Sequence, residues 1–196
     1  MTQTDIPGYT FGTDAVARSP LGLDELELLK ATLLLGDDDL AALRRSGELL
    51  AGRVEEILDV WYGFVGANPH LLAAFTGPDG QPDQVYLAAV RRRFGRWILD
   101  TARATYDQAW LDYQYEIGLR HTRAKKNQTD GAWAADHIPL RYVLALLVPI
   151  TTTLKPFLAD GGAAPDEVEA MHQAWVKAVL LQVILWSQPY VRDGDF

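Results

Sequence analysis

The side chains of this 196-residue chain that could bind a metal or do acid–base chemistry include four histidines, and the sequence contains no cysteine. Without cysteine the protein has no disulfide, thiolate nucleophile, zinc–thiolate site or iron–sulfur cluster. Any bound metal must therefore have nitrogen or oxygen ligands. No two of the histidines, His70, His121, His137 and His172, stand four residues apart, which excludes the HExxH zinc motif.

Glu169 and His172 form one ExxH pair, which is half of the paired motif that di-iron four-helix bundles use. The second copy is missing, and the neighbouring apolar stripe puts His172 at the edge of a buried face, which favours a partly exposed histidine. The sequence also lacks the GxSxG nucleophile motif and the GxGxxG and GxxxxGK[ST] phosphate-binding motifs. These absences argue against serine hydrolases and nucleotide-binding enzymes.

The stretch from 113 to 128, YQYEIGLRHTRAKKNQ, contains the histidine with the clearest structural context. Trp110, Tyr113, Ile117 and His121 are spaced 3, 4 and 4 residues apart, so a helix would place them on one face. Cationic residues at positions 120, 123, 125 and 126 complement the negative end of the helix dipole. A histidine on an apolar stripe is most often a core or surface residue, and ligation of a cofactor is the alternative.

Aromatic residues elsewhere in the chain favour the cofactor interpretation of His121. Trp61 and Tyr62 are adjacent, Phe75 follows a short turn, and Phe94 lies on the predicted helix before the one that carries His121. A buried imidazole facing several aromatic rings suits a flat, apolar, iron-bearing cofactor, because imidazole ligates iron. That cofactor would be haem b.

Helices must position these side chains, because apolar residues recur every three or four positions and no sustained period-two alternation competes. The sequence therefore predicts an all-α fold. Helices are expected at about 23–35, from 37 to 65 with Gly47 as the candidate break, around 86–98 and 110–121, at 140–158 with a kink at Pro149, and at 166–187. Residues 1–21 contain two prolines and two glycines and form an irregular arm, whose aromatic residues are expected to pack on the domain.

Length and composition fit one compact domain, 1–196, with 48% apolar residues. The net charge of -8 and the pI near 4.9 disfavour nucleic acid, despite the basic cluster RRRFGR at 91–96. The N-terminus lacks the basic and apolar regions of a secretory signal, so a cytoplasmic location is expected. The apolar runs at 142–150 and 178–186 are shorter than the ~20 residues of a spanning helix. They predict buried helices, with no membrane partner.

Several long segments of the sequence resemble the protoglobins, single-domain relatives of the globin-coupled sensors. The matching segments are IPGYTFG at 6–12, VEEILDVWYGFV at 54–65, NPHLLAAF at 68–75, YLAAVRRRFGRWILDT at 86–101, YDQAWLDYQYEIGLRH at 106–121, KKNQTD at 125–130, PITTTLKPFLA at 149–159 and LQVILWSQPYV at 181–191. The resemblance runs from end to end. It implies a globin fold with an extra N-terminal helix and with the irregular arm packing near the haem edge.

The resemblance also implies a role for particular residues around the haem. His121 matches the proximal ligand of the family, and one of its ring nitrogens would donate a hydrogen bond to a carbonyl near Ile117. Thr122 stands where relatives can have a second histidine, which removes a rival ligand. Arg93, beside Phe94, is expected to pair with a haem propionate.

On the other side of the haem, the resemblance implies a distal pocket. Its wall would be formed by Trp61, Tyr62, Phe75 and Phe94, and its border by Val65, Leu146 and Ile150. Adjacent helical residues point about 100° apart, so Trp61 and Tyr62 cannot approach the iron from the same direction. Tyr62 is the expected hydrogen-bond donor to O2.

The function that the resemblance implies is reversible binding of O2, CO and NO at a five-coordinate haem b iron. One alternative is a haem enzyme that acts on peroxide, nitrite or NO, or that carries out engineered carbene transfer. Another is a gas sensor that signals to a separate partner. Relatives form dimers through the helices that correspond to the two C-terminal ones, which predicts a homodimer.

Overall fold

Helices account for all the regular secondary structure that the computed structural model shows in residues 6–192 and 194–196, which are the residues it describes. The chain folds as α1 (Leu23–Thr32), α2 (Asp37–Leu50), α3 (Val54–Ala67), α4 (Pro69–Leu72), α5 (Gln84–Arg103), α6 (Gln108–Leu119), α7 (Leu140–Ala145), α8 (Leu147–Asp160) and α9 (Pro165–Ser187). Short 3-10 turns lie at Ala51–Arg53, Ala73–Phe75 and Gln188–Tyr190. The predicted all-α class is confirmed.

Helices α5 and α6, which carry most of the predicted site, both begin at an aspartate. The Asp83 carboxylate accepts a hydrogen bond of 2.9 Å from the backbone N–H of Tyr86. The Asp107 carboxylate accepts one of 2.8 Å from the N–H of Trp110. Each cap satisfies a backbone donor that the first helical turn leaves free, and so fixes where the helix starts.

The expected break at Gly47 is wrong. Helix α2 continues through Gly47 to Leu50, and the chain turns afterwards, at Ala51–Arg53. A Cβ atom on Gly47 would lie 3.1 Å from the Cβ of Ala102 on α5. The glycine therefore allows α2 and α5 to pack closely, a requirement that outweighs its low helix propensity.

The C-terminal helical segment divides at Leu146 into α7 and α8, three residues before the position where the sequence predicted a kink, Pro149. A proline at position 149 has no N–H to donate to the carbonyl of Ala145, where α7 ends. The 21-residue span Leu140–Asp160 has a mean hydropathy of 1.5 and could cross a membrane by length and composition alone.

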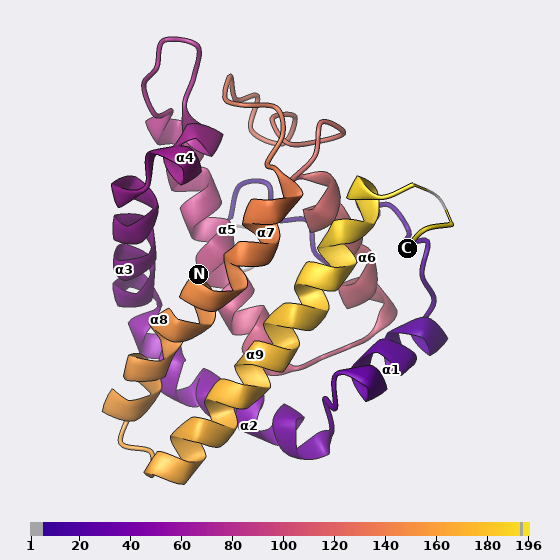
Figure 1. Ribbon diagram of the computed structural model, residues 1–196, viewed down its shortest axis with the longest axis vertical. Coiled ribbons are helices and arrows are strands. Elements are labelled where there is room, and N and C mark those ends of the chain that lie inside the picture. Colours follow the sequence, from indigo (N-terminus) through magenta and orange to yellow (C-terminus); the bar gives the residue numbers. More distant parts are fainter. Residues whose placement is uncertain (1–5, 193) are drawn as a thin grey trace.

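This span is less buried than its sequence suggested. Only 33% of its most apolar window is buried, and Leu144 and Val148 are 49% and 63% exposed. The expectation that the whole segment is a buried core helix is therefore wrong for one of its faces. The other face packs on α9, which runs beside α8 in Figure 1.

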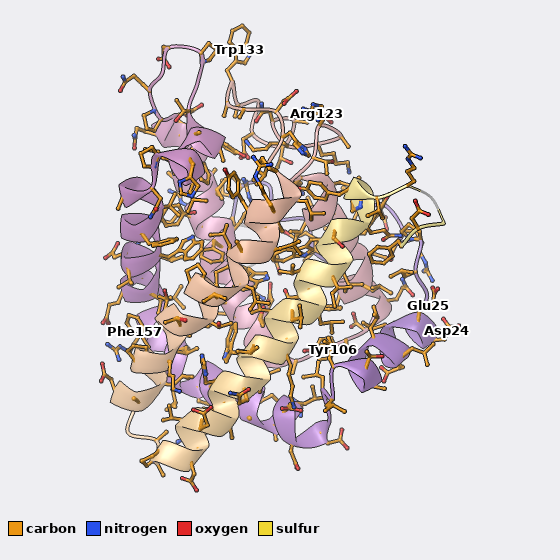
Figure 2. All side chains as sticks on the ribbon, viewed as in Figure 1. Asp24, Glu25, Tyr106, Arg123, Trp133 and Phe157 are labelled. Atoms are coloured by element: carbon orange, nitrogen blue, oxygen red, sulfur yellow. The ribbon has the colours of Figure 1, made fainter. Side chains whose placement is uncertain are left out.

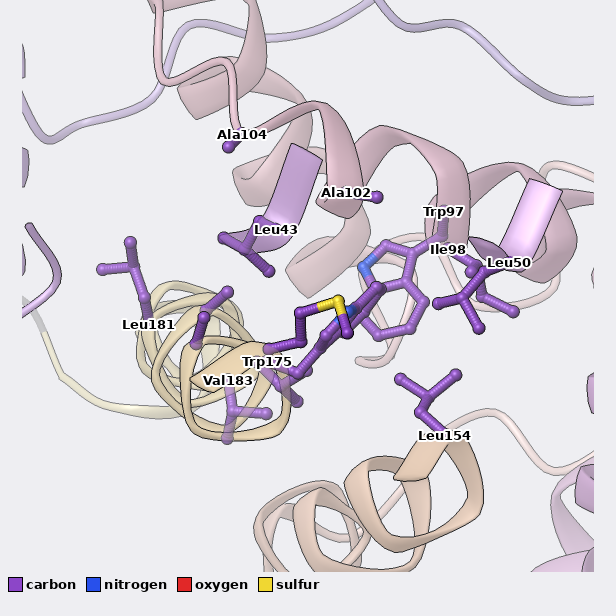
Figure 3. Close-up of a cluster of buried hydrophobic side chains, with 14 of the residues drawn as sticks. Leu43, Leu50, Trp97, Ile98, Ala102, Ala104, Leu154, Trp175, Leu181 and Val183 are labelled. Atoms are coloured by element: carbon purple, nitrogen blue, oxygen red, sulfur yellow. The ribbon is translucent and has the colours of Figure 1, made fainter. Parts of the chain in front are cut away.

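Helix α9 forms the centre of the core, where it packs along α8, α2 and α6. Figure 3 shows Trp175 of α9 and Trp97 of α5 among leucines from two other helices, Leu43 and Leu50 of α2 and Leu154 of α8. Both indole N–H groups are satisfied inside this core: Trp175 donates to the Ser46 hydroxyl at 2.8 Å and Trp97 to the Gln182 side-chain oxygen at 2.6 Å. Burial of the rings therefore leaves no unpaired indole donor.

The connection from α6 to α7, residues 120–139, contains turns and no helix. In Figure 1 it lies at the same end of the molecule as the loop between α4 and α5. Trp133 projects from it into solvent, 78% exposed (Figure 2). Other side chains of this connection point inward, and they form one wall of the site.

Candidate functional site

The ten residues that the sequence predicted around a cofactor all line one cavity of about 430 Å³. They are His121, Trp61, Tyr62, Phe75, Phe94, Val65, Arg93, Leu146, Ile150 and Ile117. They come from α3, α5, α6 and the turn that follows it, from the 3-10 turn at Ala73–Phe75, from the junction of α7 and α8, and from α8 itself. The volume lies within the usual range of small-molecule and cofactor pockets, roughly 300–1,000 Å³.

His121 lies just beyond the helix that was expected to carry it. Helix α6 ends at Leu119, and the N–H of His121 bonds the carbonyl of Gly118 at 3.0 Å in a tighter turn. The side chain nevertheless faces the cavity together with Trp110 and Ile117, as the spacing predicted. The helix boundary was therefore wrong and the assignment of the inward face was right.

The ring of His121 is held in one tautomer by a hydrogen bond to the backbone. Its Nδ1 lies 2.7 Å from the carbonyl oxygen of Ile117, the partner expected from the sequence. Because a carbonyl can only accept, Nδ1 must carry the proton, and Nε2 then keeps an unshared electron pair. His121 retains some accessible surface because it lines the cavity.

Neighbouring groups fix the position of His121 on both sides. Its carbonyl accepts a bond of 2.9 Å from the N–H of Ile138 and lies 3.1 Å from the Tyr190 hydroxyl. Its ring stacks on Trp186 of α9 with centroids 5.6 Å apart and planes inclined by 14°. The Trp186 indole donates in turn to the Gln114 side-chain oxygen at 2.9 Å. The imidazole is therefore pre-oriented.

Burial lowers the pKa of His121, because the charged imidazolium would lose its water. The hydrogen bond to Ile117 opposes this shift, and the nearby Lys126 cation adds to it. The ring is therefore neutral at neutral pH, which is the form that ligates a metal.

Aromatic and aliphatic side chains make most of the remaining wall. Trp61 packs against Phe94 with ring centroids 5.5 Å apart, and Phe75 packs against Tyr86 at 5.5 Å. Val65, Leu146 and Ile150 also line the cavity. A wall of this kind excludes water and suits a flat apolar ligand.

Tyr62 places a phenol in this apolar wall. Burial raises the pKa of Tyr62, because the phenolate would be poorly solvated, so the hydroxyl stays protonated. The Arg91 guanidinium lies over the ring, 5.6 Å from its centroid. Among the described residues the structure gives the Tyr62 hydroxyl no hydrogen-bond partner, which leaves it able to donate to a ligand.

Arg93 lines the cavity, but its guanidinium already has partners. It forms a two-pronged pair with the Asp130 carboxylate, at 2.9 and 2.6 Å, and donates to the carbonyl of Pro7 at 2.8 Å. Pairing with a propionate was predicted for it from the sequence alone. In the structure Arg93 instead ties the N-terminal arm to α5 and to the connection after α6.

The N-terminal arm closes one side of the cavity with Tyr9 and Phe11. The Tyr9 hydroxyl donates to the Asp100 carboxylate at 2.6 Å, and burial, with this hydrogen bond, raises the pKa of Tyr9 to about 12. Arg120 donates to the carbonyl of Gly8 at 2.7 Å and to the Thr10 hydroxyl at 3.0 Å. Side chains from α5 and α6 thus hold the arm in place.

Some cavity residues were missed by sequence reasoning. They include Lys126, His70, His137, Tyr142, Trp97 and Trp186. Lys126 was read as a cation that complements the end of a helix, yet it is only 3% exposed and its ammonium donates to the carbonyl of Ala74 at 2.7 Å. The signal for Trp186 was present, because it shares the apolar face of α9 with Val183 and Val179.

The ExxH pair does not form a metal site in the structure. Glu169 binds Lys155 at 2.7 Å and the Gln173 amide at 2.8 Å. Both ring nitrogens of His172 are buried, and neither has a hydrogen-bond partner within residues 6–192 and 194–196. No cluster of three or more histidine, aspartate or glutamate side chains that could hold a metal ion occurs in the part of the chain that the structure describes.

The cavity residues fit a haem group. The structure supplies a neutral imidazole with one nitrogen free and a mostly apolar wall rich in aromatic rings around one cavity. An iron porphyrin needs an axial nitrogen ligand and a dry pocket on both faces. His121 provides the only histidine nitrogen among the described residues whose tautomer is fixed by a backbone hydrogen bond at the cavity wall.

Comparison with known proteins is consistent with this geometry. A family model described as Protoglobin matches residues 23–196. Among solved structures, the globin domain of the Geobacter sulfurreducens globin-coupled sensor superposes with a TM-score of 0.66 at 18% sequence identity, covering 85% of this chain and 98% of that one. This likeness shows that the chain has a globin fold. No curated protein sequence gives a match.

Gly8 provides a test of how the arm is held, because it has a φ angle of +73° and a Cβ there would lie 2.5 Å from Nη1 of Arg93. We expect Gly8→Ala to displace the Arg93 guanidinium and to detach the arm. The overlap should destabilise the closed position of the arm by ~1–3 kcal/mol. The equilibrium constant for local opening of the arm should then rise roughly tenfold or more. Hydrogen exchange at the amides of Tyr9 and Phe11, followed by mass spectrometry, measures this.

Gly12 is the matched control for this substitution. Its φ angle is +71°, nearly the same as that of Gly8, but no atom lies within 4 Å of the added Cβ. Gly12→Ala therefore carries the same backbone strain without the clash. Equal exchange in the two variants would mean that the close packing of Gly8 against Arg93 and Thr129 does not hold the arm.

Proposed function

The chain belongs to the protoglobin family and is a globin-type haem protein, and from this premise we propose that it binds haem b through His121 and reversibly binds O2, CO and NO. The observation that carries the proposal is the hydrogen bond of 2.7 Å between Nδ1 of His121 and the Ile117 carbonyl. It leaves Nε2 of a neutral imidazole at the cavity wall with an unshared electron pair, which would ligate the iron.

Haem supplies an iron atom with one coordination position open to a diatomic gas. The residues of the chain determine how that position is reached and what surrounds it. His121 would be the proximal ligand, and its stacking on Trp186 at 5.6 Å keeps the ring plane fixed. Because the imidazole ring is already fixed, binding of the iron does not carry the entropic cost of ordering the ring.

Tyr62 is the residue we propose for stabilising O2. Its phenol is protonated and has no hydrogen-bond partner among the described residues. O2 gains negative charge when it binds a ferrous haem, and a donor in a dry pocket stabilises that charge more strongly than one in water. Trp61 and Phe94 pack together nearby and keep the pocket apolar.

The arm would shield the haem edge from water. Tyr9 and Phe11 line the cavity, and each packs edge-on against Tyr113 of α6, with centroids 5.4 and 5.3 Å apart. Exclusion of water from ferrous haem slows its oxidation once a gas is bound, so a closed arm favours reversible binding.

A gas sensor that signals to a separate partner is the second candidate function. It is favoured by the structural likeness to the globin domain of a globin-coupled sensor. Sensing would use the same cavity and the same gas-binding step. A protein partner that binds the gas-loaded and gas-free forms with different affinity would separate the two candidates.

Replacement of His121 tests the proximal ligand. We expect His121→Gly to lower the haem content of the purified protein by roughly tenfold or more, because the iron loses its protein ligand. Added imidazole should restore the absorption spectrum of the wild type by filling the space. His137→Gly is the control, because His137 also lines the cavity and its loss should leave the spectrum unchanged. Wild-type pigment and an unchanged axial-nitrogen signature in His121→Gly would refute the assignment.

Tyr62→Phe tests the distal donor. Loss of one hydrogen bond of ~1 to 1.5 kcal/mol should raise the O2 dissociation rate about tenfold. The CO dissociation rate should change little, because bound CO carries less negative charge. Stopped-flow mixing measures both rates in one preparation, so CO serves as an internal control. Unchanged O2 dissociation would exclude Tyr62 as the donor.

We also propose a homodimer through the two C-terminal helices. Leu144 of α7 and Val148 of α8 are exposed apolar side chains on the face of this segment that does not pack on α9. Val148→Glu would bury a charge in that interface and should weaken the dimer at least about tenfold, as measured by analytical ultracentrifugation. Val85, 81% exposed on α5, provides the control variant Val85→Glu. A wild-type protein that sediments as a monomer at micromolar concentration would contradict the proposal.

A further inference from the structure

Lys126 is a buried cation that the proposed site does not yet use. The residue is 3% exposed, although lysine is almost never buried unless it is paired. Its ammonium donates to the carbonyl of Ala74 at 2.7 Å and lies 3.4 Å from the Asn127 side-chain oxygen. Both partners are neutral. The structure therefore places a positive charge inside the protein without a salt-bridge partner among the described residues.

The other charged residues that line the cavity are all paired. Arg93 binds Asp130 at 2.6 Å, and Arg120 binds Glu116 at 2.9 Å. Asp100 binds Arg96 at 2.9 Å. Within residues 6–192 and 194–196, no carboxylate comes within 4 Å of the Lys126 ammonium. The charges at the cavity wall thus leave one cation without a counter-ion.

Lys126 keeps its charge at neutral pH. Burial lowers the pKa of Lys126 to about 8, and the more distant carboxylates of Asp136 and Asp130 oppose that shift. A group with this pKa is mostly protonated at pH 7. An unpaired buried ammonium costs several kcal/mol, a cost that a bound anion would remove.

The position of the ammonium suits a ligand in the cavity. Lys126 lines the cavity, and its Nζ atom lies 4.9 Å from the centroid of the Tyr86 ring on α5. An ammonium group has three donors. The bond to Ala74 uses one, and the contact with Asn127, at 3.4 Å, is long. At least one donor remains for an anionic group.

We propose that Lys126 binds a carboxylate of the tetrapyrrole held in the cavity, an inference that rests on the proposed function. An apolar macrocycle with anionic side groups matches an apolar cavity with one uncompensated cation at its wall. Arg93, which the sequence suggested for this role, has its guanidinium engaged by Asp130 and Pro7. Lys126 is thus a specificity-determining residue that selects a porphyrin with free carboxylates.

A structural role for Lys126 makes a different prediction. Its bond to Ala74 joins the connection after α6 to the turn at Ala73–Phe75. If this tether were its whole function, removal of the ammonium would weaken the binding of every porphyrin equally. A carboxylate-binding role weakens only the binding of porphyrins that have free carboxylates.

The experiment compares iron protoporphyrin IX with its dimethyl ester, whose carboxylates are blocked. Haem-free wild type, Lys126→Met and Lys126→Arg are titrated with each compound at pH 7, and affinity is measured by quenching of tryptophan fluorescence. We expect wild type to prefer the diacid. Lys126→Met should lose about tenfold to hundredfold in affinity for the diacid, the range for a hydrogen bond to a charged group, and little for the ester. Lys126→Arg should retain most of the preference.

Lys155→Met is the control. Lys155 of α8 pairs with Glu169 of α9, and neither residue lines the cavity. It should change neither affinity. Equal losses for diacid and ester in Lys126→Met would reduce Lys126 to a tether. A wild type that binds the ester as tightly as the diacid would overturn the proposal even if Lys126→Met failed to fold. A wild type that binds neither compound would refute the proposed function itself.

Discussion

The orientation of His121 is the constraint on which the rest of the site depends. A single hydrogen bond of 2.7 Å to the Ile117 carbonyl determines which ring nitrogen carries the proton. The stacking on Trp186 and the bonds to the His121 carbonyl keep the backbone and ring in place. The close packing of α6 on α9 makes this possible, because a Cβ on Gly118 would lie 3.0 Å from the Trp186 carbonyl oxygen.

Paired charges at the cavity wall hold the N-terminal arm in place. Arg93 and Arg120 each combine a carboxylate partner with a carbonyl of the N-terminal arm, so ion pairing and closure of the arm use the same side chains. Such buried pairs require good geometry to offset their loss of water. Lys126 differs from both arginines, because its partners are neutral and its charge remains to be balanced by a ligand.

Much of this architecture could be predicted from sequence, because apolar spacing reports which face of a helix is buried. That signal placed Ile117 and His121 on one inward face, and the family resemblance added the donor role of Tyr62 and the position of the arm near the haem edge. Helix ends were less predictable, since α6 stops at Leu119 through a local turn. Long-range pairing was invisible to local patterns. Asp130, which engages Arg93, follows it by 37 residues.

The remaining errors have the same physical origin. Gly47 looked like a helix breaker because the sequence does not show that Ala102 packs against it. Lys126 looked like a surface cation because its neighbours in sequence are charged, whereas its burial results from Ala74 and Tyr86, which are distant in sequence. In both cases a partner from another segment decides what the residue does.

The way the arm is anchored also sets an order of events in folding. Residues 7–10 are bonded to Arg93 and Arg120, which become neighbours only after α5 and α6 have docked and Asp130 has been brought beside them. Contacts that join such distant parts of a chain form late, because loop-closure entropy opposes them. We therefore expect newly made protein to pass through a stage in which the helices are assembled and the pocket is still open on the arm side. That interval is when a large flat molecule can enter.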